Sequence, residues 1–394
     1  MQKERSVYQT RIKTIFKKLL YIVLFISLFC LLWHLCHHLY RKNAKPWKLL
    51  LWSKSSGIFS NDEEFETFKV RPKGLLEKNL KLPNLLDISW PIPPVAKVPS
   101  GRWLPNDTIS MPSKAFEPIF SRNQRKLVKH LLNVFANKMY ENGLGDRFMI
   151  FGGTLLGSFR HHDFIPWDDD ADLLVDGNVQ HLVRKIFKDI EGGFLLYREG
   201  NIDKMYTKIL PKENNTEVDV EQSRKTSEYP WGWPYIDIFF YLSNKTHIYV
   251  ENDRTWYPKS IIFPLYFRPF GKTWYPAPKD PLAFLKYSDF HGNVCETGYS
   301  HILQTSPPAQ SMFCRDLGYK YAFVQHNIVN KFEMKSTEFP NGGDSKPSFN
   351  EIVLGEENLV FESKNTHQLI IHTIRLPVPY HNTQVETYGL SYRP

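Results

Sequence analysis

An uncharged apolar stretch near the start of the chain constrains its organisation most. Residues 19–40 contain no Asp, Glu, Lys or Arg, and they supply about the 17 to 20 apolar residues that a bilayer core requires. No small-residue cleavage pattern follows, and the stretch closes on polar, interfacial residues, namely His34, His37, His38, Arg41 and Lys42. The sequence therefore predicts a single transmembrane helix at residues 19–40, retained as a signal anchor in preference to a cleaved signal peptide.

The formal net charge of +9 raises nucleic acid or a membrane surface as a partner, so its distribution matters. Residues 1–54 carry eleven Lys or Arg against the single acid Glu4, which leaves the remaining 340 residues close to neutral. Nucleic-acid binding by the body of the protein thereby loses its main support. We interpret residues 1–18 as a basic cytoplasmic tail, although the basic residues on the two sides of the apolar stretch are nearly balanced and charge alone barely decides the orientation.

Residues 41–115 contain a proline-rich segment, and proline breaks helices and favours extended chain. Eight prolines fall between residues 55 and 115, namely Pro72, Pro83, Pro91, Pro93, Pro94, Pro99, Pro105 and Pro112. This composition predicts a solvated stem at residues 41–115, between the membrane helix and a catalytic domain at residues 116–394.

Two further features favour a lumenal position for the catalytic domain. N-glycosylation sequons begin at Asn106, Asn214 and Asn244. Of the four cysteines, only Cys295 and Cys314 lie away from the apolar stretch; they are either a disulfide of an oxidising compartment or two unconnected buried thiols. We therefore expect a Golgi or endoplasmic reticulum membrane protein whose catalytic domain is lumenal.

Helical and strand periodicities alternate beyond residue 120. A helix is expected from Ser121, which forms a capping-box pattern with Gln124, to Gly143, followed by a strand at 147–151 and a short helix at 152–160. Asn178 is expected to cap a further helix that stops at Gly192. More strands are expected in the second half of residues 168–175 and at 194–198, 204–210, 235–242 and 368–376. The pattern predicts an α+β fold with a mixed β-sheet.

An aspartate cluster, Asp168-Asp169-Asp170-Ala171-Asp172, runs straight into the apolar residues 173–175. In extended chain Asp170 and Asp172 point the same way, with their Cα atoms about 6.6 Å apart at a rise of ~3.3 Å per residue. Two carboxylates this close repel each other unless a cation lies between them, and Mg²⁺ (or Mn²⁺) beside a substrate phosphate is the natural partner. A solvated acidic turn is the alternative, although the cluster opens directly onto a buried strand. Asp168 could extend the cluster, whereas Asp169 is expected to face solvent or to fix the loop.

The turn Gly152-Gly153-Thr154 supplies backbone N–H groups at a helix start, an arrangement that suits a phosphate. Because an aspartate cluster follows some fifteen residues later, we predict that Gly153 and Thr154 bind phosphate. Arg160 is a candidate phosphate clamp or a partner of the aspartates in a structural salt bridge. Lys208 is a candidate for neutralising a donor phosphate, with a plain exposed lysine as the alternative.

The block GGTLLGSFRHHDFIPWDDDADLLV, residues 152–175, resembles the signature of the LicD family, which also contains fukutin and fukutin-related protein. The resemblance implies a nucleotidyltransferase-like mixed sheet with flanking helices, and it makes Asp168, Asp170 and Asp172 the metal-binding aspartates. The segment Tyr235–Phe240 resembles the family's later strand with a single Asp, so Asp237 is the candidate third carboxylate, with a strand-end Asp bonded to the backbone as the alternative. The likeness covers about residues 120–300 and departs at Tyr287-Ser288, where the family often has Tyr-Gly.

Members of this family are similar to enzymes that transfer phosphocholine or ribitol phosphate from CDP-linked donors to glycans. The resemblance therefore implies a CDP-linked donor, a glycan or glycoprotein acceptor, and a metal held by Asp170, Asp172 and Asp237. Two other functions stay open. A metal-dependent Golgi glycosyltransferase would explain the Asp pair and the stem but not the Gly-Gly-Thr turn, and a non-catalytic assembly partner would keep the fold without turnover.

Overall fold

The computed structural model describes residues 82–188, 190, 192–211, 218–288, 292–333, 351–362 and 368–378, all within the larger of two compact units, Glu66–Pro394. The expected basic tail, the expected transmembrane helix at 19–40 and the first half of the expected stem lie outside these residues. Among the described residues, no helix is both long enough and apolar enough to cross a bilayer.

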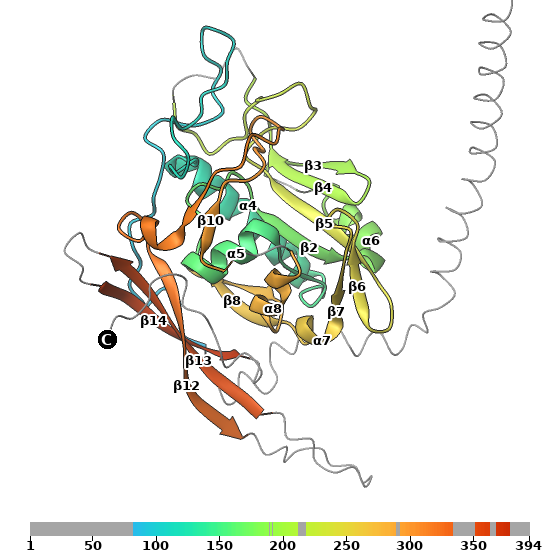
Figure 1. Cartoon of the computed structure of the whole chain (residues 1–394). Helices are drawn as coiled ribbons and strands as arrows, with labels where there is room; N and C mark the ends of the chain where they lie inside the picture. The colour runs from blue at the N-terminus through green and yellow to red at the C-terminus, as the bar shows by residue number, and fades with distance from the viewer. Residues whose placement is uncertain are drawn as a thin grey trace, which may run out of the picture. The chain divides into compact units, whose positions relative to one another are not determined.

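The largest sheet in the described part of the chain is mixed and has seven strands (Figure 1). Its main path runs β1-β2-β5-β4-β3, and β6 and then β7 extend it from β5. Only β2 and β5 pair in parallel; the other described pairs in this sheet are antiparallel. The strands are β1 (Phe148–Ile150), β2 (Asp172–Asp176), β3 (Phe194–Glu199), β4 (Ile202–Thr207), β5 (Ile236–Ser243), β6 (His247–Val250) and β7 (Thr255–Pro258). The α+β class and the mixed sheet predicted from sequence are confirmed.

The helices that flank this sheet are mostly short. They are α4 (Arg122–Glu141), α5 (Gly152–His161), α6 (Gln180–Ile186), α7 (Lys259–Ile262) and α8 (Pro281–Lys286), with 3₁₀ turns η1 (Gly177–Val179) and η3 (Cys314–Leu317). The predicted capping box is present at α4, where Ser121 and Gln124 satisfy each other's backbone N–H groups. The predicted Asn178 cap is wrong, because Asp176 accepts a hydrogen bond from the Asn178 N–H and starts η1 instead.

The core lies between α4, α5 and the sheet. Leu127, Leu131 and Phe135 of α4 are buried, and the Phe135 ring packs edge-on against Phe148 of β1 at 5.6 Å. The apolar half of β2, residues 173–175, is fully buried in the same core. Burial of that strand fixes where its leading aspartates emerge.

Two hairpins and a second sheet complete the described fold. The hairpins pair β8 (Tyr266–Phe270) with β9 (Thr273–Ala277), and β10 (Val294–Glu296) with β11 (Ser311–Phe313). A disulfide joins Cys295 of β10 to Cys314. The second sheet is antiparallel, in the order β12 (Phe323–Glu333), β13 (Glu351–Glu362), β14 (Gln368–Val378), and is drawn from orange to red in Figure 1.

A buried polar network ties this second sheet to α5 and β8. Glu357 of β13 receives two hydrogen bonds from Arg268, both at 2.8 Å, and lies 2.8 Å from His162 Nε2 and 3.2 Å from His326 Nδ1. Burial alone would raise the pKa of Glu357, but the charge of Arg268 and the two histidines hold it well below its usual value. The second sheet is therefore attached to the rest of the fold through the Arg268–Glu357 ion pair as well as through apolar contacts.

The described part of the expected stem lies on the folded unit. Leu85 is buried against Ile374 and Leu376, the Ser100 hydroxyl donates to the Ile119 carbonyl, and Trp103 Nε1 donates to the Lys225 carbonyl. Parts of residues 82–115 therefore pack on the folded unit and are not solvated, while others, such as Ile92, are exposed. The stem assignment itself stays a prediction. Proline keeps this segment extended, as expected, but extended chain still buries side chains when its remaining N–H and C=O groups find partners.

Candidate active site

Three carboxylates converge where β2 and β5 begin. Asp172 opens β2, Asp237 is the second residue of β5, and the two are direct neighbours in the parallel register. Asp170 stands two residues before β2 begins. Ligand oxygens of Asp170, Asp172 and Asp237 all lie within 4.8 Å of one another. All three side chains are buried. The alternation that predicted a shared direction for Asp170 and Asp172 agrees with this geometry, and the sheet supplies the third carboxylate.

Burial and mutual repulsion disfavour the state in which all three carboxyl groups are ionised. Burial raises the pKa of Asp170 well above its usual value, and the charges of Asp168 and Asp237 raise it further. Burial also raises the pKa of Asp172, with the charge of Asp170 as the next cause. The buried Asp170 Oδ2 has no hydrogen-bond partner among the described residues. An unsatisfied Asp170 oxygen held this close to two other carboxylates fits a divalent cation, because such ions prefer several carboxylate ligands.

The glycine turn at the start of α5 holds Asp172. The Gly153 N–H donates to Asp172 Oδ2 at 2.9 Å, and the Thr154 hydroxyl accepts from the Asp172 N–H at 2.7 Å. Gly152 has φ +47°, and a Cβ there would lie 2.6 Å from Asp172 Oδ2. The structure thus engages Gly153 and Thr154 with a carboxylate, whereas the sequence had predicted a phosphate seat for them.

Asp168 lies at the edge of the cluster and outside the group of three. Its Oδ1 accepts from the Asp169 N–H at 3.1 Å, and a Cβ at Gly153 would clash with its Oδ2. Desolvation and the charge of Asp169 raise the pKa of Asp168 to about 6. Its predicted role as a metal ligand stays a prediction.

Lys204 is a functional candidate that the sequence analysis missed. It lies opposite Asp237 in the β4/β5 register, and its Nζ is 2.7 and 3.0 Å from the two Asp237 oxygens. Its Nζ also lies 4.3 Å from the centre of the Tyr235 ring. Burial raises the pKa of Asp237, and Lys204 offsets part of that effect. Because β4 and β2 flank β5 on opposite sides, Lys204 lies beside Asp237 on the side away from Asp172. Little in the sequence marks Lys204, because the neighbouring Asp203 is also charged, so Lys204 does not stand out in its strand. The predicted Lys208 is exposed.

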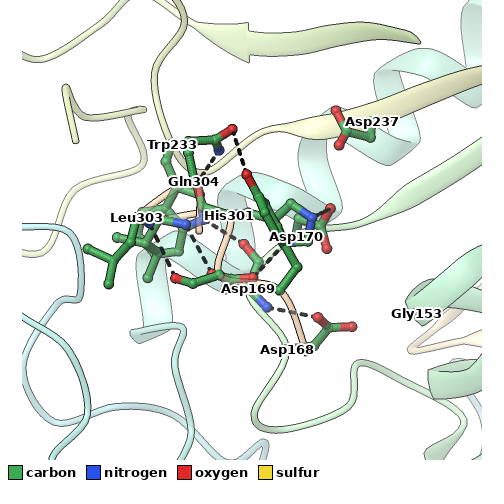
Figure 2. A network of polar contacts seen from close by, with 12 residues as sticks. Gly153, Asp168, Asp169, Asp170, Trp233, Asp237, His301, Leu303 and Gln304 are labelled. Carbon is green, nitrogen blue, oxygen red and sulfur yellow. Dashed lines mark hydrogen bonds and ion pairs between the residues drawn. The ribbon is translucent and has the colours of Figure 1, made fainter. Parts of the chain in front are cut away.

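A second missed residue, His301, reaches the cluster from a loop (Figure 2). Its Nδ1 lies 2.7 Å from Asp169 Oδ1, and its Nε2 lies 3.2 Å from Asp170 Oδ2, close enough for attraction but without hydrogen-bond geometry. Burial would lower the pKa of His301, but the hydrogen bond and charge of Asp169, with Asp172 and Asp237, raise it to about 9. Asp169 is buried and also accepts from the Ile302 N–H at 3.1 Å, so it fixes the loop and does not face solvent.

The Arg160 side chain points toward β10, the strand that carries Cys295 of the disulfide. Its NH2 group donates to the carbonyls of Gly292 at 3.1 Å and Val294 at 2.7 Å, and its NH1 group contacts Cys295 Sγ at 3.7 Å. Its role as a phosphate clamp stays a prediction, and so does the alternative of a salt bridge to the aspartates. Arg160 also lines a mainly apolar cavity of about 260 Å³ that reaches Gly152, together with Leu156, Trp167, Phe284 and Glu296.

The predicted modification sites differ in their surroundings. Asn106 is exposed, and Asn244 is half-buried with its side-chain oxygen accepting from the Thr246 N–H at 2.9 Å. Asn214 lies outside the described residues. Cys295 and Cys314 form a disulfide bond, which was one of the two alternatives predicted from the sequence.

Comparison with known proteins agrees with this geometry. Residues 145–280 match the family description LicD/FKTN/FKRP, nucleotidyltransferase domain, a span that includes β1, β2, β5 and all three converging carboxylates. The chain carries a LicD-family domain. The resemblance predicted from residues 152–175 is thereby confirmed.

One relative shows how far the likeness extends. The lipopolysaccharide cholinephosphotransferase LicD of Haemophilus influenzae is 30% identical over 109 residues, which are 26% of this chain and 39% of that relative. The chain thus spans about two fifths of the relative it matches. His301 and the second sheet lie outside the segment that matches the LicD domain.

Proposed function

We propose that the LicD domain transfers a phosphoalcohol, such as phosphocholine or ribitol phosphate, from a CDP-linked donor to a glycan or glycoprotein. The observation that carries the proposal is the convergence of Asp170, Asp172 and Asp237 from adjacent parallel strands within 4.8 Å in a buried site. The name of the bacterial relative, a cholinephosphotransferase, supports the same class of reaction.

The chain's own residues supply binding, orientation and a proton acceptor. Asp170, Asp172 and Asp237 would hold Mg²⁺ or Mn²⁺, which when bound supplies positive charge beside a diphosphate. Lys204 adds a fixed positive charge next to Asp237. The Gly153 N–H and the Thr154 hydroxyl keep Asp172 in one orientation.

The reaction we propose is an in-line displacement. Asp237 or Asp172 accepts the proton of the acceptor hydroxyl, and the hydroxyl oxygen forms a bond to the phosphorus that carries the alcohol. The bond from that phosphorus to the bridging oxygen breaks, and CMP leaves. Buried carboxylates in fixed positions suit this task because they need little reorganisation during the reaction.

We propose a Golgi or endoplasmic reticulum membrane as the location, with the domain in the lumen. The disulfide between Cys295 and Cys314 and the exposed Asn106 sequon support an oxidising, glycosylating compartment. The apolar stretch at residues 19–40 supports a membrane anchor.

The test uses the purified full chain with Mn²⁺ or Mg²⁺, CDP-choline, CDP-ribitol or UDP-sugars, and a glycoprotein acceptor fraction. Release of CMP with transfer of label to the acceptor is expected, whereas release of UDP would indicate a glycosyltransferase. Asp170→Asn should abolish CMP release while thermal stability is kept or increased, because it removes one of three mutually repelling buried charges. A wild-type chain that binds neither metal nor CDP donors in calorimetry would indicate a non-catalytic assembly partner.

A further inference from the structure

We propose that His301, which lies outside the segment matching the LicD domain, is a positioning residue that holds the Asp170 carboxylate toward the cation. The inference rests on the proposed function, because it assigns His301 a part in the same metal site. It adds a residue from a separate loop to the three carboxylates.

The contacts of His301 form a bridge between two neighbouring aspartates. The imidazole donates from Nδ1 to Asp169 Oδ1 at 2.7 Å, and its Nε2 lies 3.2 Å from Asp170 Oδ2. Asp169 is fixed at its other oxygen by the Ile302 N–H at 3.1 Å. One end of the imidazole is therefore anchored, and the other end lies against the carboxylate that belongs to the metal group (Figure 2).

The loop that carries His301 is itself held rigidly. Ser300 and Thr305 exchange two backbone hydrogen bonds, at 2.8 and 3.2 Å. Gln304 Nε2 donates to the His301 carbonyl at 2.6 Å and to the Tyr235 hydroxyl at 2.9 Å. Because Tyr235 stands two residues before Asp237, the loop is tied to the strand that supplies the third carboxylate.

The geometry favours positioning over direct ligation by His301. Asp169, Asp170 and His301 could also hold an ion, since one ligand atom of each lies within 4.8 Å of the others. We assign His301 to positioning because its Nδ1 donates to Asp169 Oδ1, while the other Asp169 oxygen accepts from the Ile302 N–H. By contrast, Asp170 Oδ2 has a nearby imidazole but no hydrogen-bond partner among the described residues, so its lone pairs remain available to a ligand. Residues that orient a ligating carboxylate typically change metal affinity by roughly 10- to 100-fold when they are replaced.

The sign of the effect separates positioning from simple charge. A positive imidazolium beside a cation site would by itself weaken metal binding, so its removal would strengthen binding. If the imidazole positions Asp170 instead, its removal would weaken metal binding. His301→Asn keeps a donor near the Nδ1 position but removes the Nε2 group, whereas His301→Gln extends a donor toward the Nε2 position.

The experiment titrates Mn²⁺ alone into the full chain by calorimetry, with no nucleotide present. We expect His301→Asn to weaken Mn²⁺ binding at least tenfold, His301→Gln to restore part of that loss, and Asp169→Asn to weaken binding without adding to the effect of His301→Asn. His181→Asn, at an exposed position on α6, is the matched control and should bind as the wild type does. Thermal melts without metal should be similar for wild type and His301→Asn.

Unchanged or tighter Mn²⁺ binding in His301→Asn would overturn the inference, as would a wild type that binds no Mn²⁺. A loss of affinity that merely follows a large fall in melting temperature would also overturn it, since that result indicates a structural role. If the wild type releases no CMP from any CDP donor but His301→Asn still weakens Mn²⁺ binding, the proposed function fails and the positioning role stands.

Discussion

The pH dependence of stability should report on the buried network around Glu357, and His162 is the residue to change. His162 is fully buried at the C-terminal end of α5, with Glu357 at Nε2 and His372 at Nδ1, 2.8 and 2.9 Å away. Burial lowers the pKa of His162 from 6.5 to about 4; Glu357 opposes this shift, while His372 and Arg268 add to it. The imidazole is therefore neutral in the folded protein at neutral pH.

The pH dependence of stability that His162 causes follows from its two pKa values, 6.5 in the unfolded chain and about 4 in the folded protein. Because the folded pKa lies below the unfolded one, the unfolded chain takes up the proton first as the pH falls. The contribution of His162 to stability is thus complete above pH 6.5 and is lost as the pH falls from 6.5 toward 4. The loss amounts to about 2 kcal/mol at pH 5 and about 3 kcal/mol below pH 4, at 1.36 kcal/mol per pKa unit.

His162→Asn removes the titration and suits the backbone, since His162 has φ +54° and asparagine tolerates the left-handed region. Urea unfolding followed by tryptophan fluorescence, at pH 7.5 and pH 5, gives the free energy of unfolding. The wild type should lose about 2 kcal/mol more than His162→Asn between the two pH values, and the His181→Asn control should behave as the wild type does. Equal pH dependence in wild type and His162→Asn would refute the reasoning.

Four other substitutions test separate contacts. Glu357→Gln leaves Arg268 buried without its counter-charge and should lower the free energy of unfolding by about 3–5 kcal/mol in urea at pH 7.5. Lys204→Met removes the ion pair with Asp237, and we expect lower CMP release at saturating metal; unchanged turnover would contradict a role for this charge. Cys314→Ser opens the loop closed by the Cys295–Cys314 disulfide and should lower the free energy of unfolding by about 3 kcal/mol. Reductant should destabilise the wild type but not this variant. Gly152→Ala places a Cβ 2.6 Å from Asp172 Oδ2 and should weaken Mn²⁺ binding measured by calorimetry.

Local signals predicted the elements that carry the three carboxylates. The capping box at Ser121, the helix that starts at Gly152 and the apolar residues after Asp172 depend on neighbours in sequence, so their pattern is visible without a structure. Asp237 needed the family resemblance in addition, because nothing in its own strand says that the strand pairs in parallel with β2.

Contacts between distant segments could not be predicted in the same way. Lys204 lies beside Asp237 only through the β4/β5 register, and the sequence around Lys204 does not say which strand it pairs with. Strands β8 and β9 were missed because Pro269 and Pro276 argue against strands, although a two-stranded hairpin tolerates proline on its open edge. Strand β13 was missed because its glutamates suggest a solvated segment, whereas Glu357 is buried against Arg268.

The matched segment is smaller than the unit that builds the site. Residues 145–280 contain Asp169, Asp170, Arg268 and His162, but the partners that satisfy these groups, His301 and Glu357, come from later in the chain. Without those partners, Arg268 would be a buried charge with no counter-ion, and Asp169 would lose its imidazole donor. The carbonyl of Phe159 near the end of α5 accepts from His326 at 3.1 Å, while the start of the same helix holds Asp172. Because α5 connects the two sets of contacts, the later residues belong to the structure that fixes the carboxylates and are not an appendage to it.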